Sequence, residues 1–264
     1  MNMLINKEAA EAAVEKSLPT LECMVVYVQP ETNDAKLLYP SLIDRSNNVI
    51  VSPAVIITSS LDEFNPLSGS WYITSMPIFS AIEILATLDE AKYQSGTKDN
   101  VTHGSEIKMS DFITLPMDYL NTENNKLSVS DLLIDEVMGN KNNISPLLAI
   151  LRKYEAYGMF RYLISQSANG EHIKVEQLSK KYGLSSPYFR FLCRKNFNSS
   201  AKKKMMSWRT ATAVLLLIES DMSILDVGLS CGYCSASHFT LDIKKNFGLT
   251  PSEIRRLEMN LYER

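Results

Sequence analysis

The stretch SILDVGLSCGYCSASHFTLDIKKNFGLTPSEIRR, residues 223–256, decides the fold of the C-terminal half of this chain of 264 residues. Ser223 is followed three residues later by Asp226, a spacing like that of a capping box, which predicts that a helix begins here. Gly232 predicts a turn, because glycine adopts a positive φ without steric cost. Three apolar residues after this turn recur every four positions, as on one helix face: Phe239, Ile243 and Phe247. The stretch therefore predicts a helix, a turn and a second helix.

Residues 175–197 repeat this pattern, with Gly183 at the turn. A small residue stands four positions before the turn glycine in each copy, Ser179 in the first and Gly228 in the second. Small side chains there would let two helices cross closely, as in a helix-turn-helix. Glycine is unfavourable inside a helix, so Gly228 should also loosen its helix by about 1 kcal/mol relative to alanine.

Polar and basic residues lie off the apolar face of each expected second helix, where a nucleic acid would meet them. The candidates in the first copy are Ser186, Tyr188, Arg190, Arg194 and Lys195. The candidates in the second copy are Ser235, Ser237, His238, Thr240, Leu241, Lys244 and Lys245. Arginine contacts phosphates and also binds guanine through two hydrogen bonds, so both roles stay open for Arg190 and Arg194. His238 has the alternatives of base and phosphate, while Thr240 and Leu241 offer apolar contacts to bases.

A longer helix is expected between the two copies, over about residues 202–219. About 17 helical residues extend roughly 25 Å. A strut of this kind could hold two reading helices about one DNA turn apart, roughly 34 Å. Lys202, Lys203 and Lys204 at its start are either phosphate anchors or a solvated face. We therefore expect an all-α DNA-binding domain over residues 145–264, with helix-turn-helix segments at about 173–197 and 223–247.

Charge is distributed unevenly between the two halves of the chain. Residues 1–149 hold 9 Lys and Arg against 20 Asp and Glu, a net charge of −11. Residues 150–264 hold 18 against 10, a net charge of +8, and the whole chain carries −3. A basic half joined to an acidic half favours a polyanion as the partner of the basic half.

The N-terminal half predicts a mixture of strands and helices. Residues 20–80 are rich in β-branched segments bounded by Pro, Asn and Ser, which is typical of strands, and residues 76–94 have a helical spacing. Polar residues predict a loop at 95–110 and a linker at 139–146, and residues 145–167 predict one long amphipathic helix. The expected fold class is therefore α+β, with an acidic regulatory or partner-binding domain over residues 1–144.

Many spaced positions agree with one known signature. The matching residues are Ile224, Asp226, Val227, Gly232, Tyr233, Phe239, Lys244, Phe247, Gly248, Thr250, Pro251 and Arg255. In this pattern the chain resembles the AraC/XylS family of bacterial transcription regulators over about residues 170–258. The resemblance implies binding to double-stranded promoter DNA, a contact to RNA polymerase, and no enzyme activity.

Several departures from the usual pattern resemble one subgroup of this family. The segments YFRFLCRK, SWR, SHF and IK are similar to the InvF/MxiE group, and LAILRKYEAYGMFRYLISQS extends the resemblance back to about residue 145. That group activates type III secretion genes. The resemblance implies a virulence activator that works with a tetratricopeptide-type secretion chaperone as co-activator.

Cys231 and Cys234 form a Cys-x-x-Cys, which leaves three roles open: small residues in a turn, a regulatory thiol, or a metal or catalytic site. A redox pair would follow a buried strand, and a structural zinc needs further ligands at finger spacing, so the first role is favoured. Two other functions remain as alternatives. One is a regulator that binds a small effector in its N-terminal domain, which the few glycines there argue against; the other is a thiol oxidoreductase.

Other classes of protein lack support in the sequence. Only three histidines occur, and neither a Walker loop nor Gly-x-Gly-x-x-Gly is found, so we expect no cofactor, no metal and no catalytic site. Apolar runs stay well below about 18 residues, and the N-terminus lacks the apolar core of a signal peptide. We expect no membrane partner and a reducing, cytoplasmic location.

Overall fold

The computed structural model of the chain describes residues 22–42, 46–94, 112–115, 126–139, 143–167 and 174–262. It consists of two compact units, Met1–Arg161 and Tyr162–Arg264. The expected loop at 95–110 lies outside the described residues, as does the middle of the expected linker at 139–146. The two compact units divide after Arg161. The bounds 145–264 that we expect for the DNA-binding domain stay a prediction.

Two antiparallel sheets make up the β part of the first unit. The first sheet has the order β6-β1-β4-β7, with β1 (Met24–Pro30), β4 (Ala54–Thr58), β6 (Trp71–Pro77) and β7 (Phe112–Thr114). The second has the order β3-β2-β5, with β2 (Lys36–Pro40), β3 (Asn47–Ile50) and β5 (Asn65–Ser68). Strands were expected in this region. The apolar run at 48–60 forms two strands of different sheets, because the chain leaves one sheet at Val51–Pro53 and enters the other.

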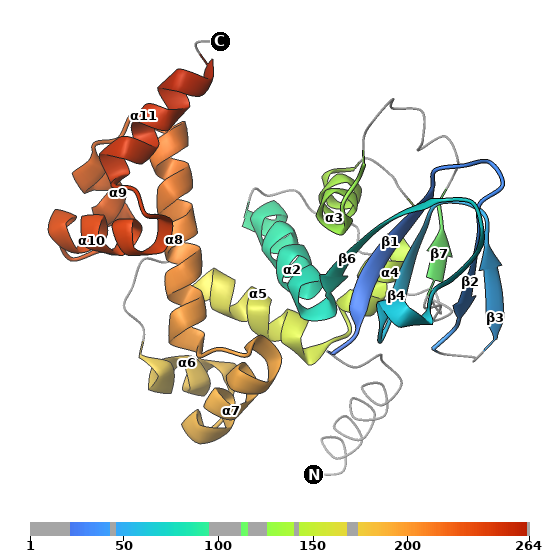
Figure 1. Ribbon diagram of the computed structural model, residues 1–264. Coiled ribbons are helices and arrows are strands. Elements are labelled where there is room, and N and C mark those ends of the chain that lie inside the picture. The colour runs from blue at the N-terminus through green and yellow to red at the C-terminus, as the bar shows by residue number, and fades with distance from the viewer. Residues whose placement is uncertain are drawn as a thin grey trace. The chain divides into compact units, whose positions relative to one another are not determined.

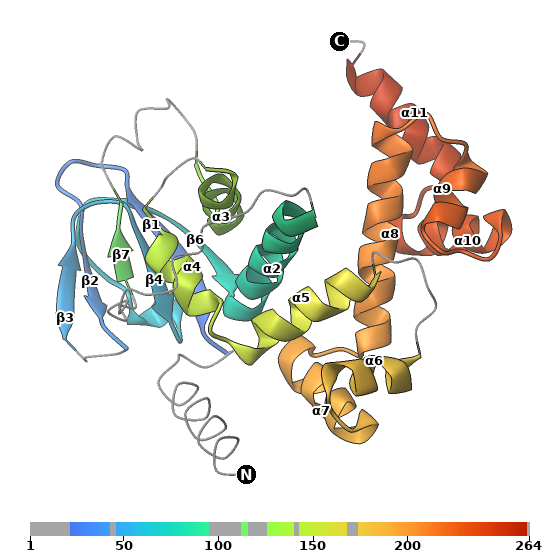
Figure 2. The ribbon, with the colours of Figure 1, turned by 180° about the vertical axis from the view of Figure 1, so that it is seen from behind.

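Strand β1 is buried on both faces. Val26 and Val28 pack against residues of the second sheet, including Leu37 and Tyr39. The opposite face of the sheet, with Tyr27, is covered by α2 (Ile78–Gln94) and α3 (Val129–Met138) (Figures 1 and 2). A strand buried on both sides needs a continuous apolar run in place of alternation, which accounts for the sequence of this strand.

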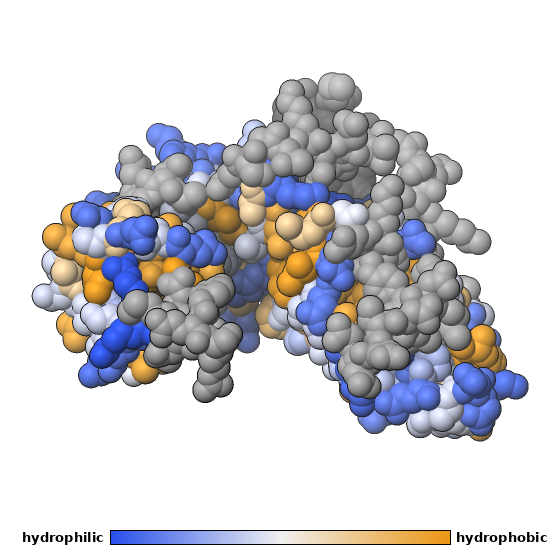
Figure 3. Space-filling view, turned by 90° about the horizontal axis from the view of Figure 1, so that it is seen from above, coloured by the Kyte–Doolittle hydropathy of each residue, from blue (hydrophilic) through white to orange (hydrophobic). Residues whose placement is uncertain are grey.

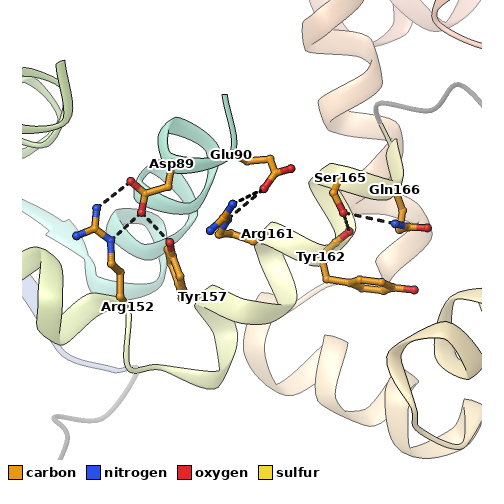
Figure 4. Close-up of polar contacts among 8 residues, drawn as sticks. All are labelled: Asp89, Glu90, Arg152, Tyr157, Arg161, Tyr162, Ser165 and Gln166. Atoms are coloured by element: carbon orange, nitrogen blue, oxygen red, sulfur yellow. Dashed lines mark hydrogen bonds and ion pairs between the residues drawn. The ribbon is translucent and has the colours of Figure 1, made fainter. Parts of the chain in front are cut away.

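The predicted single helix over 145–167 is wrong, because the chain breaks it into α4 (Ser145–Leu151) and α5 (Glu155–Ser167). The Asp89 carboxylate on α2 accepts two hydrogen bonds from the Arg152 guanidinium, both of 2.8 Å, and one of 2.7 Å from the Tyr157 hydroxyl (Figure 4). Tyr154 in the break is buried. Neither glycine nor proline occurs at the break, so tertiary contacts and not local sequence explain it.

A second ion pair, one residue further along α2, joins this helix to Arg161 of α5. Glu90 accepts hydrogen bonds from Nε and Nη2 of Arg161, at 3.1 and 2.8 Å (Figure 4). Both carboxylates are buried, with Asp89 8% and Glu90 5% exposed. Buried charges need paired hydrogen bonds, so these two pairs determine where α4 and the start of α5 pack in the first unit.

The second unit is helical. Its helices are α6 (Val175–Tyr182), α7 (Ser186–Phe197), α8 (Ala201–Glu219), α9 (Ile224–Ser230), α10 (Ala236–Phe247) and α11 (Pro251–Tyr262). The pair α6 and α7 lies toward one end of the long helix α8, and α9, α10 and α11 lie toward the other (Figures 1 and 2). The chain is thus mixed α+β at its N-terminal side and helical at its C-terminal side, as predicted.

Side-chain caps explain where several of these helices begin. The Ser223 hydroxyl accepts the Asp226 N–H at 3.1 Å, as expected before α9. Thr250 and Glu253 form both halves of a capping box before α11, with hydrogen bonds of 2.7 and 3.3 Å. Each cap satisfies a helix N–H that would otherwise lack a partner.

Candidate nucleic-acid interface

The two short helix pairs of the second unit share one turn geometry. Gly183 and Gly232 have φ of 85° and 76°, the left-handed conformation predicted for both. The next residue donates its N–H back to the first helix in each turn, from Leu184 to the Ser179 carbonyl and from Tyr233 to the Gly228 carbonyl, both at 2.9 Å. The two pairs are therefore built alike.

The predicted small residues lie where the helices cross. Ser179 is buried, and its hydroxyl lies 2.7 Å from that of Ser186 at the start of α7. Gly228 is also buried, and a Cβ added there would lie 3.0 Å from Cδ1 of Phe239 on α10. Ser186, a predicted DNA contact, is thus engaged at the helix crossing and is only partly exposed.

The outward face of α7 carries most of the residues predicted for the first copy. Four residues turned inward are buried: Phe189, Leu192, Cys193 and Phe197. Four of the five candidates are exposed: Tyr188, Arg190, Arg194 and Lys195. Phe191 was missed, although it is 58% exposed and stacks on Tyr188 with ring centroids 6.1 Å apart. The helical spacing of the four buried residues was the signal that would have found it.

The two arginines of α7 have different surroundings. Arg190 forms an exposed ion pair with Glu176 of α6. Arg194 lines a hollow of about 270 Å³ together with Arg190 and with Ser200 and Ala201 at the start of α8. Positive charge therefore gathers where α7 meets the N-terminal end of α8, which is also the positive end of the helix dipole.

Helix α10 presents the residues predicted for the second copy. Six are exposed: Ser235, Ser237, His238, Leu241, Lys244 and Lys245. Thr240 is half-buried, and Ser235 is the N-cap, whose hydroxyl accepts the His238 N–H at 3.2 Å. The His238 ring meets the edge of Tyr233 with centroids 5.6 Å apart.

Phe247 was expected on the apolar face with Phe239 and Ile243, and this prediction is wrong. Phe239 and Ile243 are buried, but Phe247 is 47% exposed. Each step of four residues advances about 40° around an α-helix, so a second step leaves the core-facing stripe.

A polar network anchors α10 to α8. The Tyr233 hydroxyl donates to Asp242 on α10 at 2.8 Å and lies 3.2 Å from the Thr210 hydroxyl on α8. The Arg209 guanidinium lies over the Tyr233 ring at 4.6 Å from its centroid. Burial raises the pKa of Tyr233, so its hydroxyl stays protonated and able to donate.

The two cysteines of the Cys-x-x-Cys have different environments. Cys231 is the buried C-cap of α9, Cys234 is exposed, and both thiols are free. In the first turn the N-cap Ser185 directly follows Leu184. In the second turn Cys234 stands between Tyr233, the equivalent of Leu184, and the N-cap Ser235. Cys234 is therefore the one extra residue of the second turn. Burial raises the pKa of Cys231, which suppresses the reactive thiolate.

No group of three His, Cys, Asp or Glu side chains in the described ranges is arranged to hold a metal ion. Among the helices that the structure describes, none is both long and apolar enough to cross a bilayer. The second unit exposes several large apolar side chains, among them Leu225 and Leu229 on α9. Figure 3 shows hydrophobic and hydrophilic residues interspersed over one face of the molecule.

Comparison with known proteins identifies a helix-turn-helix domain in this chain and similar transcription regulators. The family model described as "Helix-turn-helix domain" matches residues 178–257. Transcriptional regulator MxiE of Shigella flexneri is 29% identical over 140 residues, which cover 53% of this chain and 65% of that protein. Invasion protein InvF of Salmonella typhimurium is 24% identical over 213 residues, 81% of this chain and 94% of that protein. The match to MxiE thus spans less than two thirds of its length.

A third relative shows the family. Probable transcription factor PqrA of Proteus vulgaris is 30% identical over 97 residues, which cover 37% of this chain and 80% of that protein. The chain belongs to the AraC/XylS family of DNA-binding transcription regulators, and its relatives are named as regulators and not as enzymes.

Proposed function

We propose that this chain is a sequence-specific transcription activator whose helix pairs α6–α7 and α9–α10 are two helix-turn-helix segments. In this proposal α7 and α10 are recognition helices that enter successive major grooves of one promoter. The observation that carries the proposal is the matched construction of the two pairs, with a left-handed glycine and the same backbone hydrogen bond in each turn, the same crossing and the same outward face.

The length of α8 supports this arrangement. Its 19 residues extend about 28 Å. One turn of B-DNA is about 34 Å, and the two helix pairs add width at either end of α8, so one chain suffices to contact two grooves on one face of a duplex. The cations of α7 and α10 supply the phosphate contacts that such binding needs.

The target genes and partners are proposed from the likeness to MxiE and InvF. We assign to the chain the activation of type III secretion genes in the cytoplasm, with RNA polymerase and a tetratricopeptide-type secretion chaperone as protein partners. The acidic first unit is the part available for such a partner, because the second unit is occupied by DNA.

The test is a binding measurement on the full-length chain. A duplex would be selected from a random-sequence library, and fluorescence anisotropy would compare it with a scrambled duplex across a salt series, with and without reductant. We expect a preference for the selected duplex and a steep fall of affinity with salt. Equal affinity for both duplexes would overturn the proposal, and a preference seen only with reductant would make Cys231 and Cys234 a regulatory pair.

The variant Arg194→Lys separates the two roles that remain open for Arg194. Lysine retains the charge but lacks the planar fork that binds guanine through two hydrogen bonds. If Arg194 contacts a base, the variant loses preference between the two duplexes. If it contacts a phosphate, affinities for both duplexes change alike.

A further inference from the structure

The outward faces of α7 and α10 correspond position by position at a separation of 50 residues. Phe189 and Phe239 are the fully buried aromatic of each helix, which sets the register. In that register Phe191 of α7 takes the place of Leu241 of α10. Phe191 is 58% and Leu241 is 69% exposed, so each helix directs a large apolar side chain into solvent at the same place.

The same cations accompany the apolar residue in both helices. Three and four residues after Phe191 come Arg194 and Lys195, and three and four residues after Leu241 come Lys244 and Lys245. Residues three and four apart are neighbours on a helix surface. Each helix therefore presents one large apolar side chain with two exposed cations one turn away.

This arrangement suits a DNA major groove for a simple physical reason. The cations are attracted to the phosphates that line the groove, and the apolar side chain then faces the base edges between them. The C5-methyl of thymine is the one methyl group that the bases display in the major groove, and it lies among hydrogen-bond donors and acceptors. An exposed Phe or Leu gains binding energy there only from an apolar partner.

Phe191 has little role in the fold to explain its presence. It lies on the opposite side of α7 from the buried residues, and its ring contact is with Tyr188, which is itself 49% exposed. Leu241 likewise lies opposite the buried Phe239 and Ile243. The first helix therefore offers a wider apolar surface, made of two rings, than the second.

We propose that Phe191 and Leu241 are specificity-determining residues that each contact a thymine methyl group, so that the DNA site has a preferred thymine in each of two successive major grooves. This inference rests on the proposed function, because it requires α7 and α10 to be the recognition helices. The inference adds the chemical group that α7 and α10 recognise, the thymine methyl. The two thymine positions are separated by about 10 base pairs, one helical turn.

The experiment removes the methyl groups and leaves the base pairs intact. A duplex selected by the full-length chain is prepared a second time with deoxyuridine in place of every thymidine, and anisotropy gives the affinity for both. Burial of one methyl-sized group changes affinity roughly fourfold, so we expect the unmethylated duplex to bind about fifteenfold weaker through two contacts. Phe191→Ala and Leu241→Ala each remove the effect of deoxyuridine in one half of the site.

The matched control is Leu229→Ala, which truncates a leucine on α9 that is 51% exposed and lies outside the two recognition helices. It should retain the full methyl dependence. Equal affinity of the wild-type chain for both duplexes, with the selected sequence still preferred over a scrambled one, would overturn this inference and leave the proposed function standing. A selected site that lacks an invariant thymine in one or both halves would also overturn this inference. Absence of any sequence preference would overturn both.

Discussion

At the scale of single residues, helix propensity and core packing predict opposite effects on stability when Gly228 is replaced by alanine. Propensity alone says that alanine would stabilise α9 by about 1 kcal/mol. The structure shows that the added Cβ would lie 3.0 Å from Cδ1 and 3.3 Å from Cβ of Phe239. Phe239 is fully buried and its ring packs on Tyr233 at 4.9 Å between centroids, so it has little room to move.

We therefore expect Gly228→Ala to destabilise the second unit by about 1–2 kcal/mol, since overpacking in a core outweighs the gain in propensity. Urea denaturation followed by circular dichroism would measure the change. The matched variant is Gly228→Ala combined with Phe239→Leu, in which the smaller side chain makes room and the two changes should couple favourably. A rise in stability for Gly228→Ala alone would contradict the expectation.

Ionisation of the Tyr157 hydroxyl should make the stability of the first unit depend on pH. Burial, with the hydrogen bond to Asp89, raises the pKa of Tyr157 from 10.0 to about 12. Between these values the unfolded chain has released a proton that the folded chain retains. The contribution of Tyr157 to stability is thus complete below pH 10 and is lost as the pH rises toward 12.

The variant Tyr157→Phe should therefore show a smaller fall of melting temperature between pH 10 and 12 than the wild type, although it starts from a lower value because the Asp89 hydrogen bond is lost. Tyr93→Phe is the control, because Tyr93 is 73% exposed. Parallel pH curves for Tyr157→Phe and the wild type would show that Tyr157 does not cause the alkaline loss.

At the scale of helices, the two pairs differ in how their outward residues are held. In the first pair, Arg190 of α7 is bonded to Glu176 of α6, and their side chains are 53% and 59% exposed. An ion pair this exposed contributes under about 1 kcal/mol, so a DNA phosphate competes with Glu176 for the same guanidinium. The second pair has Leu225 and Thr240 at the equivalent places and lacks this competition.

Replacing Glu176 by glutamine should raise the affinity for a scrambled duplex about threefold at low salt, because the freed Arg190 adds one phosphate contact. The salt dependence should steepen by about one unit of slope. Glu219→Gln removes the same charge from the far end of α8 and serves as the control. A weaker affinity for Glu176→Gln would mean that Glu176 orients Arg190 for binding and does not compete with DNA.

At the scale of the whole molecule, the chain forms two units with separate cores. The first has a core between its two sheets, with residues such as Val26 and Tyr39. The second has a core around α8 and the α9–α10 pair, with residues such as Leu217 and Phe239. Units with separate cores are expected to unfold as separate cooperative steps.

Calorimetry of the full chain should therefore show two transitions that respond to different variants. Asp89→Asn leaves Arg152 with a weakened partner in the first unit and should lower only one transition, by about 3 kcal/mol of stability. Gly228→Ala should lower only the other. A single transition that both variants shift would contradict two separately folding units.

Local sequence determined much of the second unit, because its turns and helix starts depend on residues close together in the chain. Gly183 and Gly232 are in the left-handed turns expected of them, and Ser223 caps α9 as its spacing to Asp226 predicts. Ten of the twelve predicted DNA-contact residues are exposed, as helical spacing favours, and the other two, Ser186 and Thr240, are half-buried. The hydroxyls of Ser186 and Ser235 have partners within the helix pairs.

Tertiary structure alone decided the features that depend on residues far apart in the sequence. The break between α4 and α5 follows from the buried carboxylates of Asp89 and Glu90, which lie 63 and 71 residues before their arginine partners. The close approach that an added Cβ at Gly228 would make is to Phe239 on another helix, so helix propensity does not show it. Local propensity acts over a few residues, whereas burial and ion pairing depend on the neighbours that folding brings together, so these could not be predicted from local patterns.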